Sequence, residues 1–282
     1  MSKTILITGA STGFGYALAD EAAERGHHVI ATARKPESVH SLIDKHGDKV
    51  LAAKLDVTDK DSIQNAFNLA SQTFGQIDVL INNAGFGLIG ALEEFSESEI
   101  HDQLNTNVAG VILTTQEALH YMRAQQSGHI INISSVAGFV GYPGSALYAA
   151  SKHAVEGLSQ GLAKEVAEFG INITVVNPGP FRTNFAGSSL KLAEKKIEVY
   201  AGIHERQERM QTQLNGNQAG DPVKAARVIL DMIKIDEPPF TLPLGGMAYS
   251  EIPNRLQRTL DEIEAIKPIG LPTDFPDETD TI

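Results

Sequence analysis

Short runs of β-branched and aliphatic residues alternate along this chain with longer segments of helical periodicity. No other property of the sequence narrows the choice of folds as much, because this alternation is typical of βαβ units around a parallel sheet. The expected strands are 3–8, 28–33, 50–55, 79–82, 129–134, 172–176 and 240–243. The expected helices are 15–25, 59–74, 98–123, 146–169 and 222–233. The sequence therefore predicts an α/β fold, a doubly wound parallel sheet with helices on both faces.

The length of 282 residues fits one large α/β domain. No polar linker divides the chain, so we expect a main domain over 1–245 and a C-terminal extension over 246–282. A charged segment at 188–217 is expected to form a small helical lid inserted into that domain. The last ten residues carry acidic but no basic side chains, and we expect them to be frayed or docked on a surface.

Composition excludes several classes of function. The net charge of −12 argues against nucleic acid as the main partner, and the absence of cysteine excludes disulfides and thiolate chemistry. Glycines interrupt the apolar N-terminal stretch and no run is long enough for a membrane span, so we expect a cytoplasmic protein. No His-Glu-x-x-His or Gly-x-Ser-x-Gly motif occurs, so neither a metal site nor a serine hydrolase is expected.

A glycine-rich turn joins the first expected strand to the first helix. In a nucleotide-binding interpretation Gly9 permits the sharp turn, Gly13 lets the backbone approach a pyrophosphate, and Gly15 lets the helix pack closely on the sheet. The unpaired N–H groups of the helix N-terminus would then face the phosphates. The alternative is a flexible βα turn without a ligand.

Read as Gly-x-x-x-Gly-x-Gly after Thr8, this turn resembles that of the short-chain dehydrogenase/reductase family. The resemblance extends over roughly residues 3–185 through further motifs: Asn82-Asn83-Ala84-Gly85, Asn107, Ser135, Tyr148 with Lys152, and Pro178-Gly179 with Thr183. It implies a Rossmann-type sheet and a nicotinamide-dependent oxidoreductase, carbonyl-reductase-like or hydroxysteroid-dehydrogenase-like. The residue types at these positions are specific enough for us to expect an enzyme.

The resemblance also implies which residues contact the cofactor. Asp56 and Val57 would flank the adenine, the 83–85 backbone would line the adenosine ribose, and Thr183 would fix the carboxamide. An alternative for Asp56 is to cap the turn that follows it. The full expected set is Gly9, Ser11, Thr12, Gly13, Phe14, Gly15, Arg34, Asp56, Val57, Asn83, Ala84, Gly85, Tyr148, Lys152, Pro178, Gly179, Phe181 and Thr183.

The end of the second expected strand indicates which cofactor is bound. An enzyme that selects NAD generally has a carboxylate there, roughly 20 residues beyond the glycine turn, whereas this chain has Arg34 and Lys35. A guanidinium can bind the 2′-phosphate through two charge-assisted hydrogen bonds and stack on adenine, so we predict NADP over NAD. The alternative is a solvated basic pair.

Tyr148 and Lys152 are four residues apart in an expected helix, so both side chains emerge on one face. A neighbouring ammonium and an oxidised nicotinamide favour the phenolate, so we expect a depressed pKa that suits Tyr148 to acid–base catalysis near neutral pH. Ser135, at the end of the fifth strand, would orient the substrate oxygen, and Ser134 would face the opposite side. The resemblance implies that Asn107 holds a water beside the lysine; alternatively it is a helix-bending polar residue.

An apolar pocket is expected around the reacting oxygen, which favours a lipophilic ketone or secondary alcohol, steroid-like, retinoid-like or aromatic. The expected lining residues are Phe86, Leu88, Val136, Phe139, Val140, Tyr142, Phe181 and Phe185. The alternative is that half of them only pack the loops. A protein that senses NADPH without catalysis is the alternative function. The resemblance implies a homodimer or homotetramer formed through helices here at 98–123 and 146–169. The tail past Gly245 would cover or replace part of such an interface.

Overall fold

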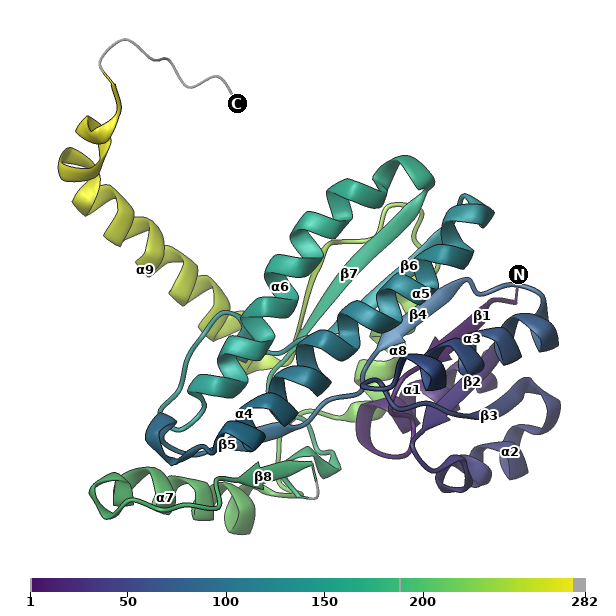
Figure 1. The fold of residues 1–282 in the computed structure, drawn as a ribbon, viewed down its shortest axis with the longest axis horizontal. Coiled ribbons are helices and arrows are strands. Elements are labelled where there is room, and N and C mark those ends of the chain that lie inside the picture. The colour runs from purple at the N-terminus through teal and green to yellow at the C-terminus, as the bar shows by residue number, and fades with distance from the viewer. Residues whose placement is uncertain (1, 188, 276–282) are drawn as a thin grey trace.

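The computed structural model describes residues 2–187 and 189–275, with the side chains of Ala186 and Leu214 left out. Seven parallel strands form its main sheet in the order β3-β2-β1-β4-β6-β7-β9. Their bounds are β1 (Thr4–Ile7), β2 (His28–Ala33), β3 (Val50–Lys54), β4 (Val79–Asn82), β6 (Gly128–Ile133), β7 (Ile171–Pro178) and β9 (Thr241–Leu244). The predicted doubly wound Rossmann-type sheet is thus confirmed, and every expected strand is present with ends shifted by at most two residues (Figure 1).

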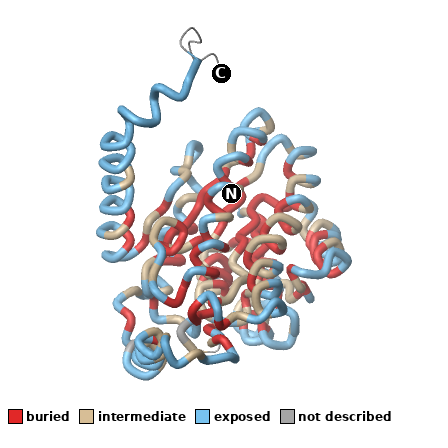
Figure 2. The backbone as a smooth tube through the Cα atoms, turned by 60° about the vertical axis from the view of Figure 1, so that its left-hand side comes forward, coloured by how far each residue is buried: buried red, intermediate tan, exposed pale blue. Residues whose placement is uncertain are grey.

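Helices cover both faces of this sheet. One layer consists of α1 (Gly13–Glu24), α2 (His40–His46) and α8 (Pro222–Met232), and the other of α3 (Lys60–Phe74), α5 (Gly110–Gln125) and α6 (Ala146–Val166). Alternate strand residues enter the two cores, as Ile5 and Ile7 do on one face and Leu6 on the other. Figure 2 shows the resulting buried centre, with exposed residues confined to the outside.

Local signals explain where several helices begin. The Asp59 side chain accepts hydrogen bonds from the backbone N–H groups of Asp61 and Ser62 at the start of α3. Asp221 caps α8 in the same way, with Pro222 as its first residue. In both helices the capping aspartate directly precedes the first helical residue.

The predicted helix over 98–123 is present without a break, but it is not α-helical throughout. The structure divides it into α4 (Glu97–Leu104), a π-helical segment over Asn105–Ala109, and α5. A π segment inserts an extra residue into the turn and is enriched at functional sites. The short helix α2 was also not predicted.

A second, smaller sheet lies near the carboxyl ends of the main strands. It pairs β5 (Gly87–Ile89) with β8 (Leu190–Leu192) in parallel, and α7 (Ala201–Arg209) follows it. The two strands come from the segments after β4 and after β7, so the predicted lid is tied to the body by backbone hydrogen bonds. Figure 1 shows β8 and α7 below the main sheet.

The C-terminal extension forms one long helix, α9 (Gly246–Gly270), followed by a short 3₁₀ turn over Leu271–Thr273. Its first turns pack on the body, and the remainder points away into solvent (Figure 1). Most of the acidic end, 276–282, lies outside the described residues. Among the described helices, none is both long and apolar enough to cross a membrane.

Candidate active site

The glycine turn has the backbone conformation that the sequence predicts. Gly9 and Gly13 have φ values of +68° and +60°, a region that side chains other than glycine rarely adopt. A Cβ on Gly15 would collide with the carbonyl oxygen of Gly9 and with the Asn83 amide. Glycine is thus required at all three positions, and the turn leaves its N–H groups at the start of α1 facing the cavity described below.

Thr8 and Asn83 fasten this turn to the end of β4. The Thr8 hydroxyl accepts hydrogen bonds from the backbone N–H groups of Asn83 and Ala84, both at 2.9 Å. The Asn83 amide donates to the carbonyl oxygens of Thr8 and Gly9 at 2.9 and 3.0 Å. These bonds explain the Asn-Asn-Ala-Gly motif, because they fix the turn without filling the space in front of it.

The region expected to hold the adenosine lies beside β2 and β3. Arg34 directly follows β2 and is exposed, while the Asp56 Oδ1 accepts hydrogen bonds from the backbone and hydroxyl of Thr58. Burial raises the pKa of Asp56, but those bonds and the charges of Arg34 and Lys54 outweigh it, so the pKa is lowered. Asp56 therefore caps the following turn, as the alternative had it, and its ionised carboxylate lies within the field of Arg34.

Val57 contributes its side chain to packing. It is buried, and a Cβ on Gly110 would lie 2.7 Å from its Cγ2, so the side chain faces the start of α5. Neither Arg34, Asp56 nor Val57 lines the large cavity at the carboxyl ends of the strands. Their predicted contacts with adenine and the 2′-phosphate stay predictions.

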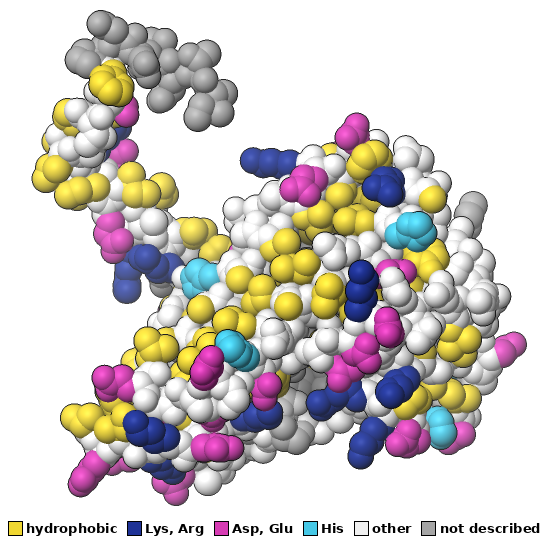
Figure 3. All heavy atoms as spheres, in the orientation of Figure 1, with side chains coloured by type: hydrophobic (Ala, Val, Ile, Leu, Met, Phe, Trp, Pro, Cys, Tyr) yellow, Lys and Arg dark blue, Asp and Glu magenta, His cyan; other side chains and the backbone are white. Residues whose placement is uncertain are grey.

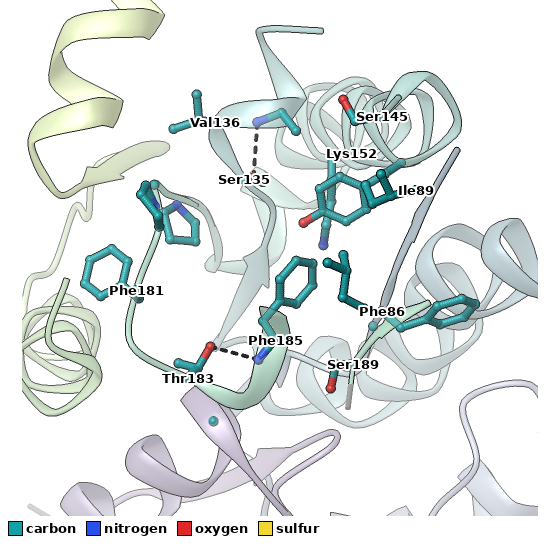
Figure 4. Close-up of a pocket in the computed structure, with 18 of the residues that line it drawn as sticks. Phe86, Ile89, Ser135, Val136, Ser145, Lys152, Phe181, Thr183, Phe185 and Ser189 are labelled. Atoms are coloured by element: carbon teal, nitrogen blue, oxygen red, sulfur yellow. Dashed lines mark hydrogen bonds between the residues drawn. The ribbon is translucent and has the colours of Figure 1, made fainter. Parts of the chain in front are cut away.

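That cavity has a volume of about 360 Å³ and brings together the glycine turn and the predicted catalytic residues. Ser135, Tyr148 and Lys152 lie on its wall, together with Gly9, Gly13, Asn83, Gly85, Pro178 and Thr183. Figure 4 shows Ser135 and Lys152 on one side and Thr183 with Phe185 on the other. Since these residues come from five separate segments, only the fold could bring them to one site.

Tyr148 and Lys152 lie one turn apart on α6, as predicted. The Lys152 Nζ is 5.8 Å from the centre of the Tyr148 ring and donates a hydrogen bond of 2.8 Å to the carbonyl oxygen of Ile133. Lys152 is buried, so this bond holds its ammonium at the end of β6. The Lys152 ammonium therefore has a fixed position close to the Tyr148 ring.

The pKa values in this site follow from burial. Burial raises the pKa of Tyr148 to about 12, although the Ser135 hydroxyl acts in the opposite direction. Burial also lowers the pKa of Lys152 to about 8, and the charge of Glu156 opposes that shift. The predicted depression of the Tyr148 pKa is therefore wrong for the protein alone, because desolvation of the phenolate outweighs the hydrogen bond with the Ser135 hydroxyl.

Ser134 and Ser135 point in different directions, as predicted from strand alternation. A Cβ on Gly138 would lie 2.8 Å from both the Ser134 hydroxyl and Oε1 of Glu156, so Ser134 is directed toward the buried carboxylate. The Ser135 Oγ accepts a hydrogen bond of 3.1 Å from the Ala137 N–H and remains at the cavity (Figure 4). Ser135 is thus the hydroxyl available to a ligand.

Asn107 lies within the π segment and is almost fully buried. Its Oδ1 accepts from the Phe86 N–H at 3.0 Å, and its Nδ2 donates to the Phe86 carbonyl at 2.8 Å and to the Ser151 hydroxyl at 3.2 Å. A Cβ on Gly85 would lie 3.1 Å from Oδ1 of Asn107. The amide is satisfied, so Asn107 fixes the loop after β4 against α6.

Glu156, which the sequence analysis did not single out, lies one turn beyond Lys152 on α6. The carboxylate is buried, and its Oε1 accepts a hydrogen bond of 2.6 Å from the Asn177 amide. Burial raises its pKa, against the opposing effects of that bond and the Lys152 charge. The spacing Tyr-x-x-x-Lys-x-x-x-Glu could have indicated that Glu156 lies near Lys152, because residues four apart share a helix face.

The outer part of the cavity is mainly apolar, and it corrects part of the sequence prediction. Phe86, Val136, Tyr142, Phe181 and Phe185 line it as predicted. Leu88 does not, because it is buried in β5, and Phe139 and Val140 do not, because they pack against Val136, Ala248 and Ile252 instead. Side chains that were not predicted complete the wall: Ile89, Ile203, Met210 and Met247.

Aromatic contacts organise this part of the site. The Phe181 and Phe14 rings lie 5.1 Å apart, and the Phe185 and Tyr148 rings 5.7 Å apart. The Phe185 N–H donates to the Thr183 hydroxyl at 3.2 Å, which turns the chain after β7 across the cavity (Figure 4). Phe185 thereby covers the edge of the phenol.

The lid contributes a wall to the cavity, which the sequence analysis did not expect. Ile203, Arg206, Gln207 and Met210 of the lid face the site. A buried carboxylate, Glu94, anchors it, because its Oε1 accepts from the Ile197 N–H and lies 2.6 Å from Nε2 of His204. The alternating charges of the lid predict a solvated segment, so the sequence pattern did not indicate that these four side chains face the cavity.

Comparison with known proteins identifies the family. A family model described as short chain dehydrogenase matches residues 3–219. A 3-ketodihydrosphingosine reductase of Bacteroides thetaiotaomicron is 39% identical over 253 residues, which is 87% of this chain and 88% of that protein. A short-chain dehydrogenase from Streptomyces avermitilis is 38% identical, with a TM-score of 0.90 over 98% of this chain and 100% of that chain. The structure of ElxO with NADP bound is 30% identical, with a TM-score of 0.73 over 89% of this chain and 100% of that chain.

Proposed function

Because this chain belongs to the short-chain dehydrogenase family, and is therefore an oxidoreductase, we propose that it interconverts a lipophilic ketone and its secondary alcohol with NADP. When bound, the cofactor would supply hydride-transfer chemistry, as NADPH in reduction of the ketone and as NADP⁺ in oxidation of the alcohol. The observation that carries this proposal is the convergence of Ser135, Tyr148 and Lys152 on one wall of a cavity that also contains the glycine turn. A reacting oxygen at that wall meets both a proton donor and an orienting hydroxyl.

The residues present fit a dinucleotide. A Cβ on Gly13 would lie 3.4 Å from the Cβ of Thr183, so glycine keeps a passage open between the turn and the segment after β7. The start of α1 offers backbone N–H groups to a pyrophosphate at that passage. Lys152 would bind the nicotinamide ribose hydroxyls, and Thr183 the carboxamide.

Each catalytic side chain has one task in this mechanism. Tyr148 gives its hydroxyl proton to the substrate oxygen in reduction and takes it back in oxidation. Ser135 donates a hydrogen bond that orients and polarises the same oxygen. Since burial raises the pKa of Tyr148 to about 12, the phenol stays protonated at neutral pH, which suits it to act as the acid in reduction.

Asn107 acts through other residues and is a positioning residue in this proposal. Its amide binds both backbone groups of Phe86 and the Ser151 hydroxyl, so it connects the loop that would cover the cofactor to the helix that carries Lys152. A π segment also redirects backbone carbonyls away from their usual partners. We infer that one of them binds a water beside Lys152.

NADP is proposed over NAD because the end of β2 carries a cation and no carboxylate. Arg34 is exposed at this position, where its guanidinium can bind a 2′-phosphate. The ElxO structure with NADP provides a precedent among relatives. The other expected cofactor contacts, Ser11, Thr12, Phe14 and Phe181, belong to the same proposal.

A lipophilic substrate is proposed because aromatic and aliphatic side chains from β5, the lid and the start of α9 line the outer cavity. A cavity of this size and lining would remove a large part of the apolar surface of a bound substrate from water. By its name, the Bacteroides thetaiotaomicron relative reduces a keto compound. We therefore propose a ketone with a sizeable apolar group next to the carbonyl.

The experiment is the loss of NADPH absorbance with a panel of ketones that carry either long apolar or short polar groups. We expect turnover with the apolar ketones, and a higher kcat/KM with NADPH than with NADH. Turnover of only short polar ketones would contradict the substrate class. NADPH binding without turnover of any ketone would favour an NADPH-sensing protein instead.

A further inference from the structure

The helix α9 leaves the body of the protein after its second turn. Ala248 and Ile252 are buried against Val136, and the rest of the helix extends into solvent (Figures 1 and 2). A helix of this length that stands alone in water gains nothing from tertiary packing. We therefore examine the exposed side chains of α9 for the kind of surface that they fit.

One face of α9 is apolar from Ile252 to Ile263. Leu256, Leu260 and Ile263 follow Ile252 at spacings of three or four residues, so the face that packs on the body continues as a stripe beyond it. These three side chains are 48%, 57% and 54% exposed. Figure 3 shows hydrophobic side chains gathered on the projecting helix. We call Leu256, Leu260 and Ile263 the α9 stripe.

Charged residues beside the stripe are arranged so that two copies of α9 have complementary charges. Arg255 and Glu262, seven residues apart, lie along the same edge of the stripe, with 3.6 Å between the guanidinium and the carboxylate. If two copies of α9 crossed antiparallel near Leu260, the edge with Arg255 would meet the same edge of the other copy, which brings its Glu262 opposite. Leu256 would face Ile263 in the same register, and both contacts would occur twice by symmetry.

We propose that the α9 stripe is an interface with a second copy of this chain, in which the two α9 helices pack antiparallel. Each stripe covers the apolar surface of the other, and two Arg255–Glu262 pairs flank it. An anionic membrane surface fits less well, because the chain has a net charge of −12 and α9 carries four acidic and three basic residues.

This interface is connected to the active site. Met247, in the first turn of α9, lines the cavity, and Ala248 packs beside it under Val136. Pairing of the two α9 helices would hold this first turn in place and so support one wall of the substrate cavity. The proposal does not depend on which reaction the cavity performs.

Sedimentation velocity of the full chain and of Leu260→Arg tests this proposal. Leu260→Arg places two cations at the centre of the pair, so we expect the association constant to fall about 100-fold or more and the assembly to halve in mass. Ala265→Arg is the matched control, because Ala265 is apolar, exposed, and lies on the side of α9 opposite the stripe. Equal masses for wild type and Leu260→Arg would overturn the proposal. A membrane-binding result would also overturn the proposal. In that result, vesicles of anionic phospholipid bind wild type but not Leu260→Arg, and the two proteins have the same mass in solution.

Charge reversal distinguishes pairing between copies from the contact within one helix. Arg255→Glu and Glu262→Arg should each weaken association, because like charges then meet across the interface. Mixing the two purified variants should restore it, because the glutamate pair of one copy then faces the arginine pair of the other. The pair within one helix is not restored by mixing, so failure of the mixture to associate would overturn the antiparallel arrangement.

Discussion

The Nζ of Lys152 donates a hydrogen bond to the carbonyl oxygen of Ile133. This bond holds the ammonium at the end of β6, within reach of the cavity and one turn of α6 from Tyr148. Burial lowers the pKa of Lys152 to about 8, so the charge of this residue changes close to physiological pH.

The first prediction concerns the pH dependence of NADPH binding. If Lys152 binds the ribose hydroxyls as an ammonium, NADPH affinity should fall as the pH rises through about 8, by at most about tenfold per pH unit. Titration of NADPH fluorescence over this range measures the effect. Lys152→Arg keeps its charge, so its affinity, although weaker, should not vary with pH. A wild-type affinity that stays constant through this range would remove Lys152 from cofactor binding.

Arg34→Asp should reverse the cofactor preference. The substitution removes the proposed ligand of the 2′-phosphate and adds a carboxylate that repels it and can bind the ribose of NAD. The ratio of kcat/KM for NADPH to that for NADH should drop by about 100-fold or more, as expected for the loss of a bidentate charged contact. Lys49→Asp, the same charge change at the start of β3, is the control. A ratio that Arg34→Asp leaves unaltered would exclude Arg34 from selecting the cofactor.

Thr8→Val tests the connection between the glycine turn and β4. Valine has the shape of threonine but leaves the N–H groups of Asn83 and Ala84 without their acceptor. We expect a loss of about 2–4 kcal/mol in the free energy of unfolding in urea, together with weaker NADPH binding. Thr4→Val, at the start of the strand that leads to Thr8 and also buried, should change stability by less than about 0.5 kcal/mol. Equal effects of the two substitutions would show that the Thr8 hydroxyl has no special role.

Much of this arrangement was predictable from the sequence, because local chemistry specified it. The glycines of the turn, the caps at Asp59 and Asp221, and the Tyr148–Lys152 spacing each act over a few residues. The outer cavity was less predictable. Leu88 has the same apolar character as Ile89, and only the pairing of β5 with β8 decides that Ile89 faces the cavity while Leu88 is buried.

Long-range packing also explains the remaining errors. For the protein alone, the predicted depression of the Tyr148 pKa was wrong because burial, which the local sequence does not specify, raises this pKa. The π segment around Asn107 was hidden by a regular helical pattern, since its cause is the hydrogen bonding of Asn107 to Phe86. The long α9 helix was not predicted, although Leu256, Leu260 and Ile263 recur at helical spacing. Most of this helix has no core of its own chain to pack against.

Glu156→Gln should increase stability in a pH-dependent way. The folded-state pKa of Glu156 is raised above the ordinary value of 4.5, so its stabilising effect is complete below 4.5 and is lost as the pH rises through the folded value. Glutamine keeps the acceptor for Asn177 but cannot ionise, so the variant should become more stable than wild type above this window. Urea unfolding at several pH values measures the difference. A difference that does not change with pH would show that Glu156 ionises without cost.

The role of Tyr148 as the proton donor is the central claim, and Tyr148→Phe tests it most directly. Phenylalanine preserves the ring contact with Phe185 but removes the hydroxyl. The measurement is single-turnover oxidation of bound NADPH by one ketone that wild type reduces. At saturating NADPH we predict a rate lower by about 10²–10⁴-fold. A wild-type rate in Tyr148→Phe would contradict the account.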